Sequence, residues 1–272
     1  MRADRDFQTK LARLVRDSLD DNLRCWIEWG NEYWNCGEWG YEGCVFLEEL
    51  SSKNGLSKRQ NYARESLDLF EDFHRVFSET GERNRLLTIL GGQSGYAEEL
   101  KRSAREINKL GRMDEVDVFA IAPYYHKGRK INTAWKQGGI DAVFPILNQI
   151  VEDMYNGKGE SGEALAGNFE LAAKYDKPMV AYEGGQHLTS WMGLEEGLTA
   201  IINRAPQMYD HYLNYFSAWE QEEVAHTFVH YSDIAFYNDY EAFGLKEYYD
   251  QPLKDNHKLR AFLDWIKGSS AE

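Results

Sequence analysis

The hydrophobic positions of the chain form two kinds of segment. Apolar residues spaced three to four apart predict amphipathic helices, and short apolar runs that end in glycine or proline predict strands buried on both faces. The predicted strands are residues 24–29, 85–90, 116–122, 178–183 and 227–231. The predicted helices are residues 6–19, 57–79, 96–110, 140–154, 163–175, 194–203, 207–223 and 256–266. A helix followed by five strand–helix units predicts an α/β fold with a parallel sheet, either a (β/α) barrel or a doubly wound sheet.

One connection departs from this regular alternation. Residues 36–56 follow the first predicted strand and are rich in Gly and Glu. Because most strand–helix connections are only a few residues long, we expect this segment to be an extended loop at the rim of a binding cleft.

Two of the predicted strands carry a glutamate at or just beyond their carboxyl end: Glu32 follows residues 24–29, and Glu183 ends residues 178–183. In a parallel α/β barrel the carboxyl ends of the strands form the catalytic face. Amides, imidazoles and aromatic rings accompany the glutamates and follow the third strand, and these are residue types of a sugar-binding site. The candidate substrate-binding residues are Asn31, Trp34, Tyr124, Tyr125, His126, Gln186, His187 and Trp191, with Trp39 and His230 as further candidates.

Paired carboxyl groups are the machinery of glycoside hydrolysis. A retaining enzyme uses one as acid/base and a second, about 5–5.5 Å away, as nucleophile. Glu32 and Glu183 come that close only if the sheet curls into a barrel. The alternative is that each is a solvated loop residue, which is the common fate of a single glutamate.

The motifs WGNEYWN, residues 29–35, and AYEGGQHL, residues 181–188, carry a family resemblance. They resemble the strand-four Asn-Glu and the strand-seven Glu of the clan of retaining (β/α)8 glycoside hydrolases. Together with APYY, residues 122–125, they look like a set found in bacterial cellulase-like barrel proteins, many of them known only as carbohydrate-binding. One departure is that His230, Tyr231 and Ser232 stand where the clan usually has a tryptophan at the end of strand eight.

The resemblance implies roles for individual residues. Glu32 would be the general acid/base, Glu183 the nucleophile and Asn31 the donor to the sugar 2-hydroxyl. Tyr124 would be the tyrosine that holds the nucleophile, with Tyr125 as the alternative.

The resemblance also implies a partial (β/α)8 barrel, strands four to eight, within a single domain over residues 1–272. Strands one to three would then be missing, so we expect an N-terminally truncated chain with weak or no hydrolysis. An apolar edge at residues 25–29 would be exposed and could pair edge to edge with a second copy. Glu28 would point into the barrel, with its partner in the missing part.

Composition limits the partners. A net charge of −14 with no basic stripe argues against nucleic acid and anionic membrane surfaces. No apolar run approaches the roughly 20 residues of a membrane span, and the N-terminus lacks a signal peptide, although secretion stays open if the true start lies upstream. No cofactor motif or metal-ligand spacing such as HExxH is present, so we expect a carbohydrate substrate, no cofactor and no metal.

Cysteines and a serine motif leave further alternatives. Cys25 is expected to be buried, whereas Cys36 and Cys44 could pair in an oxidising compartment or stay reduced. A serine hydrolase is disfavoured because the GxSxG motif around Ser94 fails at Tyr96.

Three functions therefore compete. The first is a retaining glycoside hydrolase, the second a carbohydrate-binding protein without the chemistry, and the third a structural half barrel that self-associates. Both glutamates are present, which favours the hydrolase, because a binding protein needs neither of them.

Overall fold

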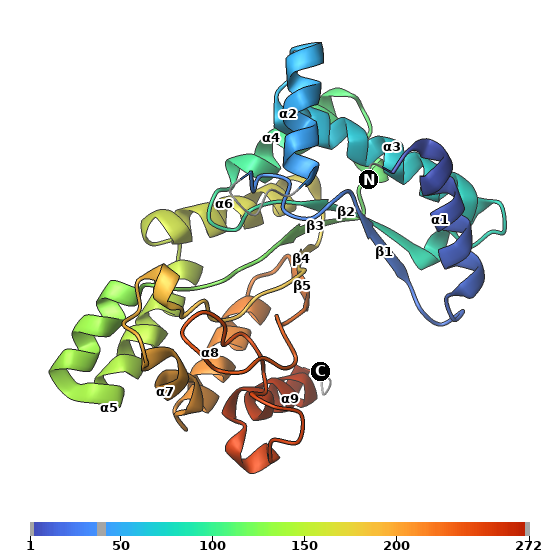
Figure 1. The fold of residues 1–272 in the computed structure, drawn as a ribbon. Helices are drawn as coiled ribbons and strands as arrows, with labels where there is room; N and C mark the ends of the chain where they lie inside the picture. Colours follow the sequence, from blue (N-terminus) through green and yellow to red (C-terminus); the bar gives the residue numbers. More distant parts are fainter. Residues whose placement is uncertain (1–2, 37–41, 270–272) are drawn as a thin grey trace. The chain divides into compact units, whose positions relative to one another are not determined.

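The computed structural model describes residues 3–36 and 42–269 (Figure 1). The chain divides into two compact units. The first consists of Met1–Ile121 with Glu170–Met179, and the second of Ala122–Phe169 with Val180–Glu272. The prediction of a single domain over residues 1–272 stays a prediction.

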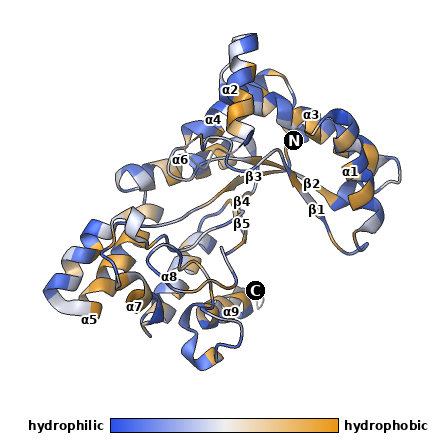
Figure 2. Ribbon diagram, viewed as in Figure 1, coloured by the Kyte–Doolittle hydropathy of each residue, from blue (hydrophilic) through white to orange (hydrophobic). Residues whose placement is uncertain are grey.

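The described part of the first unit contains three parallel strands and four complete α-helices, besides the end of α6 (Gly159–Tyr175) and two short 3-10 helices. The strands are β1 (Cys25–Glu28), β2 (Leu86–Gly91) and β3 (Val118–Ile121), and the helices are α1 (Arg5–Ser18), α2 (Glu42–Asn54), α3 (Lys58–Ser78) and α4 (Glu98–Lys109). β1 pairs with β2 and β2 with β3, with Cys25 opposite Leu86 and Ile89 opposite Val118. Figure 2 shows the hydrophobic colouring of β2 and β3, which fits strands buried on both faces.

Helix α3 illustrates why these elements form. Ser57 and Gln60 make a capping box, in which each side chain bonds the other's backbone N–H at the helix start. Phe70, Phe73 and Phe77 fall on one face and are fully buried. α3 packs against α1, α2 and α4, so it is the central helix of this unit.

The second unit is built around helix α8. Its described elements are α5 (Gly128–Tyr155), most of α6 (Gly159–Tyr175), β4 (Met179–Ala181), α7 (Leu198–Arg204), α8 (Met208–Glu220), β5 (Ala225–Phe228) and α9 (His257–Ser269). α8 packs against α5 and α9 and buries Tyr212, Tyr215, Phe216 and Trp219. α5 bends at Gly138 and Gly139, and Gly139 has the left-handed φ of +62° that favours glycine.

The hydrogen-bonded strand order follows the chain. Within the first unit Phe119 N donates to Pro178 O (3.0 Å), and within the second Val229 N donates to Ala181 O (2.9 Å). All five predicted strands are present, so the prediction of an α/β fold is confirmed, while the partial (β/α)8 barrel stays a prediction.

One predicted loop is corrected, and one helix extends further than predicted. Residues 42–54 of the expected loop 36–56 form helix α2, because Cys44 and Leu47 lie three apart and are both buried. Residues 37–41, including Trp39, lie outside the described part. The part of α5 (Gly128–Tyr155) that follows its kink at Gly138 and Gly139 corresponds to the predicted helix 140–154, whereas the helical residues 128–137 before the kink were not predicted.

None of the described helices combines the length and apolar character needed to cross a bilayer.

Candidate functional site

In the first unit, the turn after β1 carries Glu32. Its φ of +44° is left-handed, a conformation that is uncommon outside glycine and that clusters at functional sites. Asn35 stabilises the turn, with its N donating to Glu32 O (2.8 Å) and its Nδ2 to Glu32 Oε2 (3.3 Å). Asn31 is exposed and Glu32 half-buried, so the carboxylate lies at the strand end where the sequence predicts it.

The next residue, Tyr33, anchors this turn. Its ring stacks on Tyr62 with 3.8 Å between centroids, and its hydroxyl lies 3.1 Å from both Glu99 Oε2 and Ser103 Oγ. Burial, followed by the charge of Glu99, raises the pKa of Tyr33. Trp34 packs edge-on against Tyr33 at 5.2 Å and stays half-buried.

Glu28 is engaged within the first unit. Its carboxylate occupies the space that a Cβ on Gly91 would need, and Gly91 N donates to the Tyr62 hydroxyl (2.9 Å). Burial raises the pKa of Tyr62, and the charge of Glu28 adds to that effect. β2 and α3 therefore supply close neighbours of Glu28, while its expected partner in the missing part stays a prediction.

In the second unit, α8 ties together the segments that follow β3 and β4. The Tyr215 hydroxyl donates to Pro123 O (2.7 Å) and accepts from Gly185 N (3.1 Å). Tyr125 N donates to Gly185 O (3.3 Å), and His187 N donates to Tyr125 O (2.9 Å). The two strand-end segments thus lie side by side and bring most of the predicted binding residues together.

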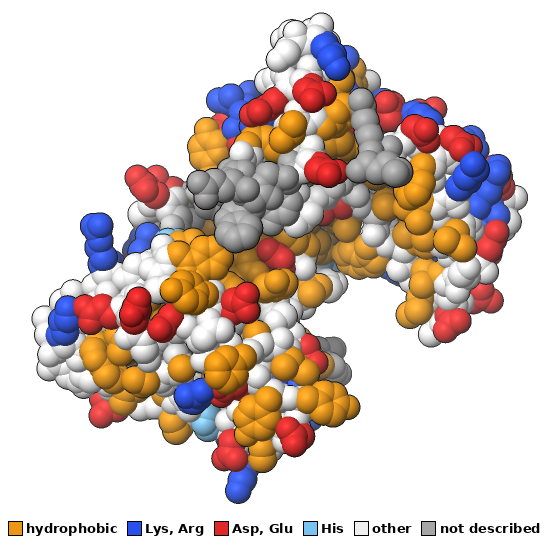
Figure 3. Space-filling model, in the orientation of Figure 1, with side chains coloured by type: hydrophobic (Ala, Val, Ile, Leu, Met, Phe, Trp, Pro, Cys, Tyr) orange, Lys and Arg blue, Asp and Glu red, His pale blue; other side chains and the backbone are white. Residues whose placement is uncertain are grey.

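Four rings surround His187 and form an aromatic cluster with it. The distances from its ring centroid are 5.5 Å to Tyr124, 6.3 Å to His126, 5.7 Å to Trp191 and 5.2 Å to Phe243. Trp191 is 60% exposed and held at its inner end, where Nε1 donates to Tyr240 O (3.0 Å). Hydrophobic side chains reach the surface of this unit in the space-filling view (Figure 3).

The imidazole at the centre of the cluster is neutral at neutral pH. Burial, followed by the neighbouring His126, lowers the pKa of His187 to about 4. Burial, followed by the charge of Lys127, also lowers the pKa of His126. Within the described residues His187 Nε2 is buried without a hydrogen-bond partner, so it can donate to or accept from a sugar hydroxyl.

Two of the predicted binding residues, Gln186 and Tyr125, make hydrogen bonds within the protein through their side chains. Gln186 Nε2 donates to Ala242 O (2.7 Å), and its Oε1 accepts from Leu188 N (2.7 Å). The Tyr125 hydroxyl lies 2.7 Å from His211 Nε2, and burial raises the pKa of Tyr125. Both side chains brace the loops that present the aromatic cluster.

Glu183 follows β4 by two residues and is half-buried. It belongs to the second unit and Glu32 to the first. The predicted 5–6 Å separation between the two carboxyl groups stays a prediction.

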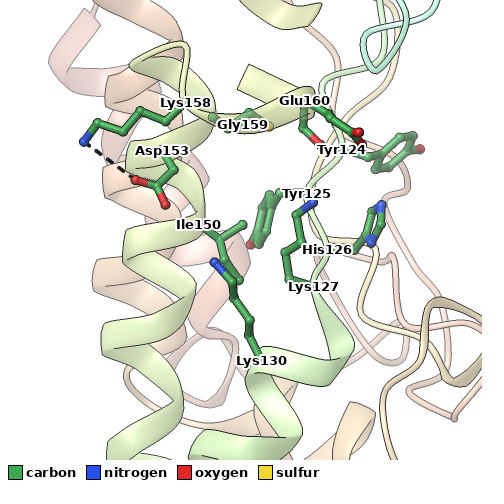
Figure 4. Close-up of a pocket in the computed structure, with 12 residues that line it drawn as sticks. Tyr124, Tyr125, His126, Lys127, Lys130, Ile150, Asp153, Lys158, Gly159 and Glu160 are labelled. Atoms are coloured by element: carbon green, nitrogen blue, oxygen red, sulfur yellow. Dashed lines mark ion pairs between the residues drawn. The ribbon is translucent and has the colours of Figure 1, made fainter. Parts of the chain in front are cut away.

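Two cavities of the second unit adjoin the cluster. One of about 260 Å³ lies between residues 124–130 and the facing parts of α5 and α6 (Figure 4). The other, of about 400 Å³, lies between residues 126–130 and residues 191–193. His126, Lys127 and Lys130 line both.

Five residues at this site were not predicted from the sequence: Phe243, Tyr212, Tyr215, Lys127 and Lys130. The basic run HKGRK, residues 126–130, directly after the third predicted strand, is the one local signal that could have found the two lysines. The other three come from α8 and from a late loop, far away in sequence.

The sulfur atoms of Cys36 and Cys44 and a carboxylate oxygen of Glu48 lie within 4.8 Å of one another, a grouping that can hold a metal. In the structure the two sulfur atoms are joined in a disulfide. Of the two alternatives for these cysteines, paired or reduced, the structure shows the paired one. Cys25 is buried as predicted.

No protein-family model matches the chain, and no curated protein matches it. Among solved structures, the chain is similar to a modular endo-β-1,4-mannanase from Cellulomonas fimi, of glycoside hydrolase family 26. The identity is 15% and the TM-score 0.47, and the match covers 96% of this chain and 45% of the mannanase chain. The chain thus spans less than half the length of that structure.

Proposed function

We propose that this protein is a retaining glycoside hydrolase that acts on an oligosaccharide or polysaccharide. The observation that carries the proposal is the aromatic cluster around neutral His187, set on the loops after β3 and β4. Exposed Trp191 offers a face for a sugar ring, and His187 Nε2 offers a hydrogen bond to a hydroxyl.

The proposed reaction is a double displacement by Glu32 and Glu183. Glu183 attacks the anomeric carbon while Glu32 protonates the departing glycosidic oxygen, giving a glycosyl ester on Glu183. Glu32 then takes a proton from water, the water oxygen bonds to the anomeric carbon, and Glu183 leaves as a carboxylate. The product keeps the anomeric configuration of the substrate.

Local geometry in each unit supports these roles. Glu32 itself has a left-handed backbone conformation. Its neighbour Tyr33 is buried and makes two side-chain hydrogen bonds, which hold the turn in place. Tyr124 is the better candidate to hold Glu183, because the Tyr125 hydroxyl is bonded to His211.

The test is hydrolysis of a panel of aryl β-glycosides by the wild-type chain and by Glu32→Gln and Glu183→Gln. We expect each variant to lose on the order of 100-fold or more in kcat/KM, and NMR of the first-formed sugar to show retention. Glu196→Gln is the matched control, because Glu196 is exposed in the same unit. Full activity in Glu183→Gln would exclude the nucleophile assignment.

The second candidate is a carbohydrate-binding protein without hydrolysis. It is favoured by the fact that the whole aromatic cluster lies within one unit, so a sugar platform exists there independently of Glu32. Calorimetry distinguishes the two functions: sugar binding by the wild-type chain, with no turnover of any substrate in the panel, would select the binding protein.

A further inference from the structure

The start of helix α5 carries a cluster of positively charged side chains, although neither a helix N-terminus nor an acidic chain favours them there. Lys127, Arg129 and Lys130 lie at or in the first turn, which holds no acidic residue. A helix N-terminus carries a partial positive charge and favours carboxylates over cations. The chain as a whole has a net charge of −14, so neither the helix nor the overall composition accounts for these cations.

The described residues provide no ion pair or side-chain hydrogen bond to these three cationic groups, and all three side chains are exposed. Two other lysines of the unit are paired: Lys136 with Glu195, and Lys158 with Asp153 at 3.7 Å. The three groups are therefore available to a ligand.

All three cations line the 400 Å³ cavity, which we call the basic cavity. Its lining is His126–Lys130 with Trp191–Gly193 and includes no carboxylate. Figure 4, a view of the adjoining 260 Å³ cavity, shows Lys127 and Lys130 rising from the start of α5 with Tyr124 and His126 on one side and Ile150 and Asp153 on the other. Asp153 and Glu160 line the 260 Å³ cavity, so the basic cavity is the better site for an anion.

The two walls of the basic cavity are fixed to each other. Asn132 Nδ2 donates to Gly193 O (2.9 Å), and Glu195 N donates to Asn132 Oδ1 (3.0 Å). Gly128 lies so close to the backbone of Gly193 and Leu194 that a Cβ there would collide with it. The cationic helix start and the segment carrying Trp191 thus form a preorganised site, which lowers the cost of ordering on binding.

We propose that the basic cavity binds the anionic substituent of a sugar, a carboxylate or a sulfate ester, and that the substrate is therefore an acidic glycan. Arg129 can present its planar fork to two oxygens of either group, while Lys127 and Lys130 act as point charges. The exposed face of Trp191 takes the apolar face of the same or the adjoining sugar ring. This inference rests on the proposed function for its sugar chemistry, whereas its charge requirement is tested separately.

The experiment is calorimetry on Glu183→Gln, chosen so that no probe is hydrolysed. The probes are hexasaccharides of a polyuronate, of a sulfated galactan and of a neutral β-1,4-linked glucan. We expect one of the two acidic probes to bind at least tenfold more tightly than the neutral probe at 50 mM salt, and that advantage to shrink at 500 mM salt. Which acidic probe binds identifies the substituent.

Cavity variants identify the site on the same background. Lys130→Gln and Arg129→Gln should each weaken acidic-probe binding about fivefold to tenfold and leave neutral-probe binding unchanged. Lys254→Gln, which removes an exposed lysine outside both cavities, is the matched control, and circular dichroism verifies that each variant is folded.

The outcomes separate the two proposals. Equal affinity for neutral and acidic probes, or no effect of Lys130→Gln and Arg129→Gln, overturns the acidic-glycan inference and leaves the hydrolase proposal standing. Failure of every probe to bind also overturns the acidic-glycan inference, whereas the hydrolase proposal is decided by the panel of aryl β-glycosides.

Discussion

Tyr33 shows how a single side chain can fix the conformation of a proposed catalytic residue. The Tyr33→Phe substitution removes a buried hydroxyl that contacts Glu99 and Ser103, so Glu99 Oε2 loses a hydrogen bond while Ser103 Oγ keeps its bond to Glu99 O. We predict a loss of about 1–2 kcal/mol in the free energy of unfolding, measured by urea denaturation. Tyr96→Phe is the control, because Tyr96 is 46% exposed. Equal stability losses in the two variants would argue against the anchoring role.

Gly91 on β2 has no side chain, and this leaves room for the carboxylate of Glu28 on β1. We predict that Gly91→Ala lowers stability by about 1–3 kcal/mol, since its Cβ would meet the Glu28 carboxylate. Gly95→Ala, in open space two residues after Gln93, should have a much smaller effect. The double variant Gly91→Ala/Glu28→Ala should lose less than the sum of its single changes. Additive losses would show that the two residues do not interact.

At the scale of elements, apolar runs were a reliable guide to the strands. Runs such as RLLTIL and VDVFAIA contain the observed β2 and β3, because strands buried on both faces are apolar throughout. Helix α2 was missed because its buried pair, Cys44 and Leu47, stands among glycines and glutamates that are typical of loops. The first turns of α5 were missed for a similar reason, since their few buried residues are separated by polar ones.

The candidate site was predictable only in part. Tyr124, His126, His187 and Trp191 lie in the segments after two predicted strands, so the local sequence indicates their common edge. Phe243 contacts His187 and Tyr215 contacts Gly185 from other parts of the chain. The local pattern of residues does not reveal contacts between residues so far apart in the sequence.

β1 is an edge element in the described part of the chain, because it pairs only with β2. Trp26 on this strand is 41% exposed, and unpaired apolar strand edges promote association. We predict that Trp26→Lys reduces any concentration-dependent association seen by sedimentation velocity. Leu14→Lys, at a position on α1 that is 63% exposed, should leave it unchanged. Association that is identical in the wild-type chain and Trp26→Lys would place the contact elsewhere.

At the scale of the whole molecule, buried histidines are concentrated in the second unit. Burial lowers the pKa of His187 to about 4 and of His211 and His230 to about 3, compared with the ordinary value of 6.5. In the described part of the first unit, His74 is the residue of this kind, and burial lowers its pKa too. The unfolded chain binds protons more readily at these histidines than the folded chain does. The free energy of unfolding is therefore at its full value above pH 6.5 and decreases as the pH falls toward 4 and below.

The second unit should therefore lose stability before the first when the pH falls. We predict that hydrogen-exchange protection factors, corrected for the intrinsic pH dependence of exchange, fall at least tenfold in α8 between pH 7 and pH 4.5 and fall less in α3. His187→Gln should make the fall in α8 smaller because it removes one of the titrating groups, whereas His226→Gln, at an exposed position, should not. Protection that falls equally in both helices would mean that the two units unfold as one cooperative body. Protection that rises on acidification would contradict the direction of the histidine pKa shifts.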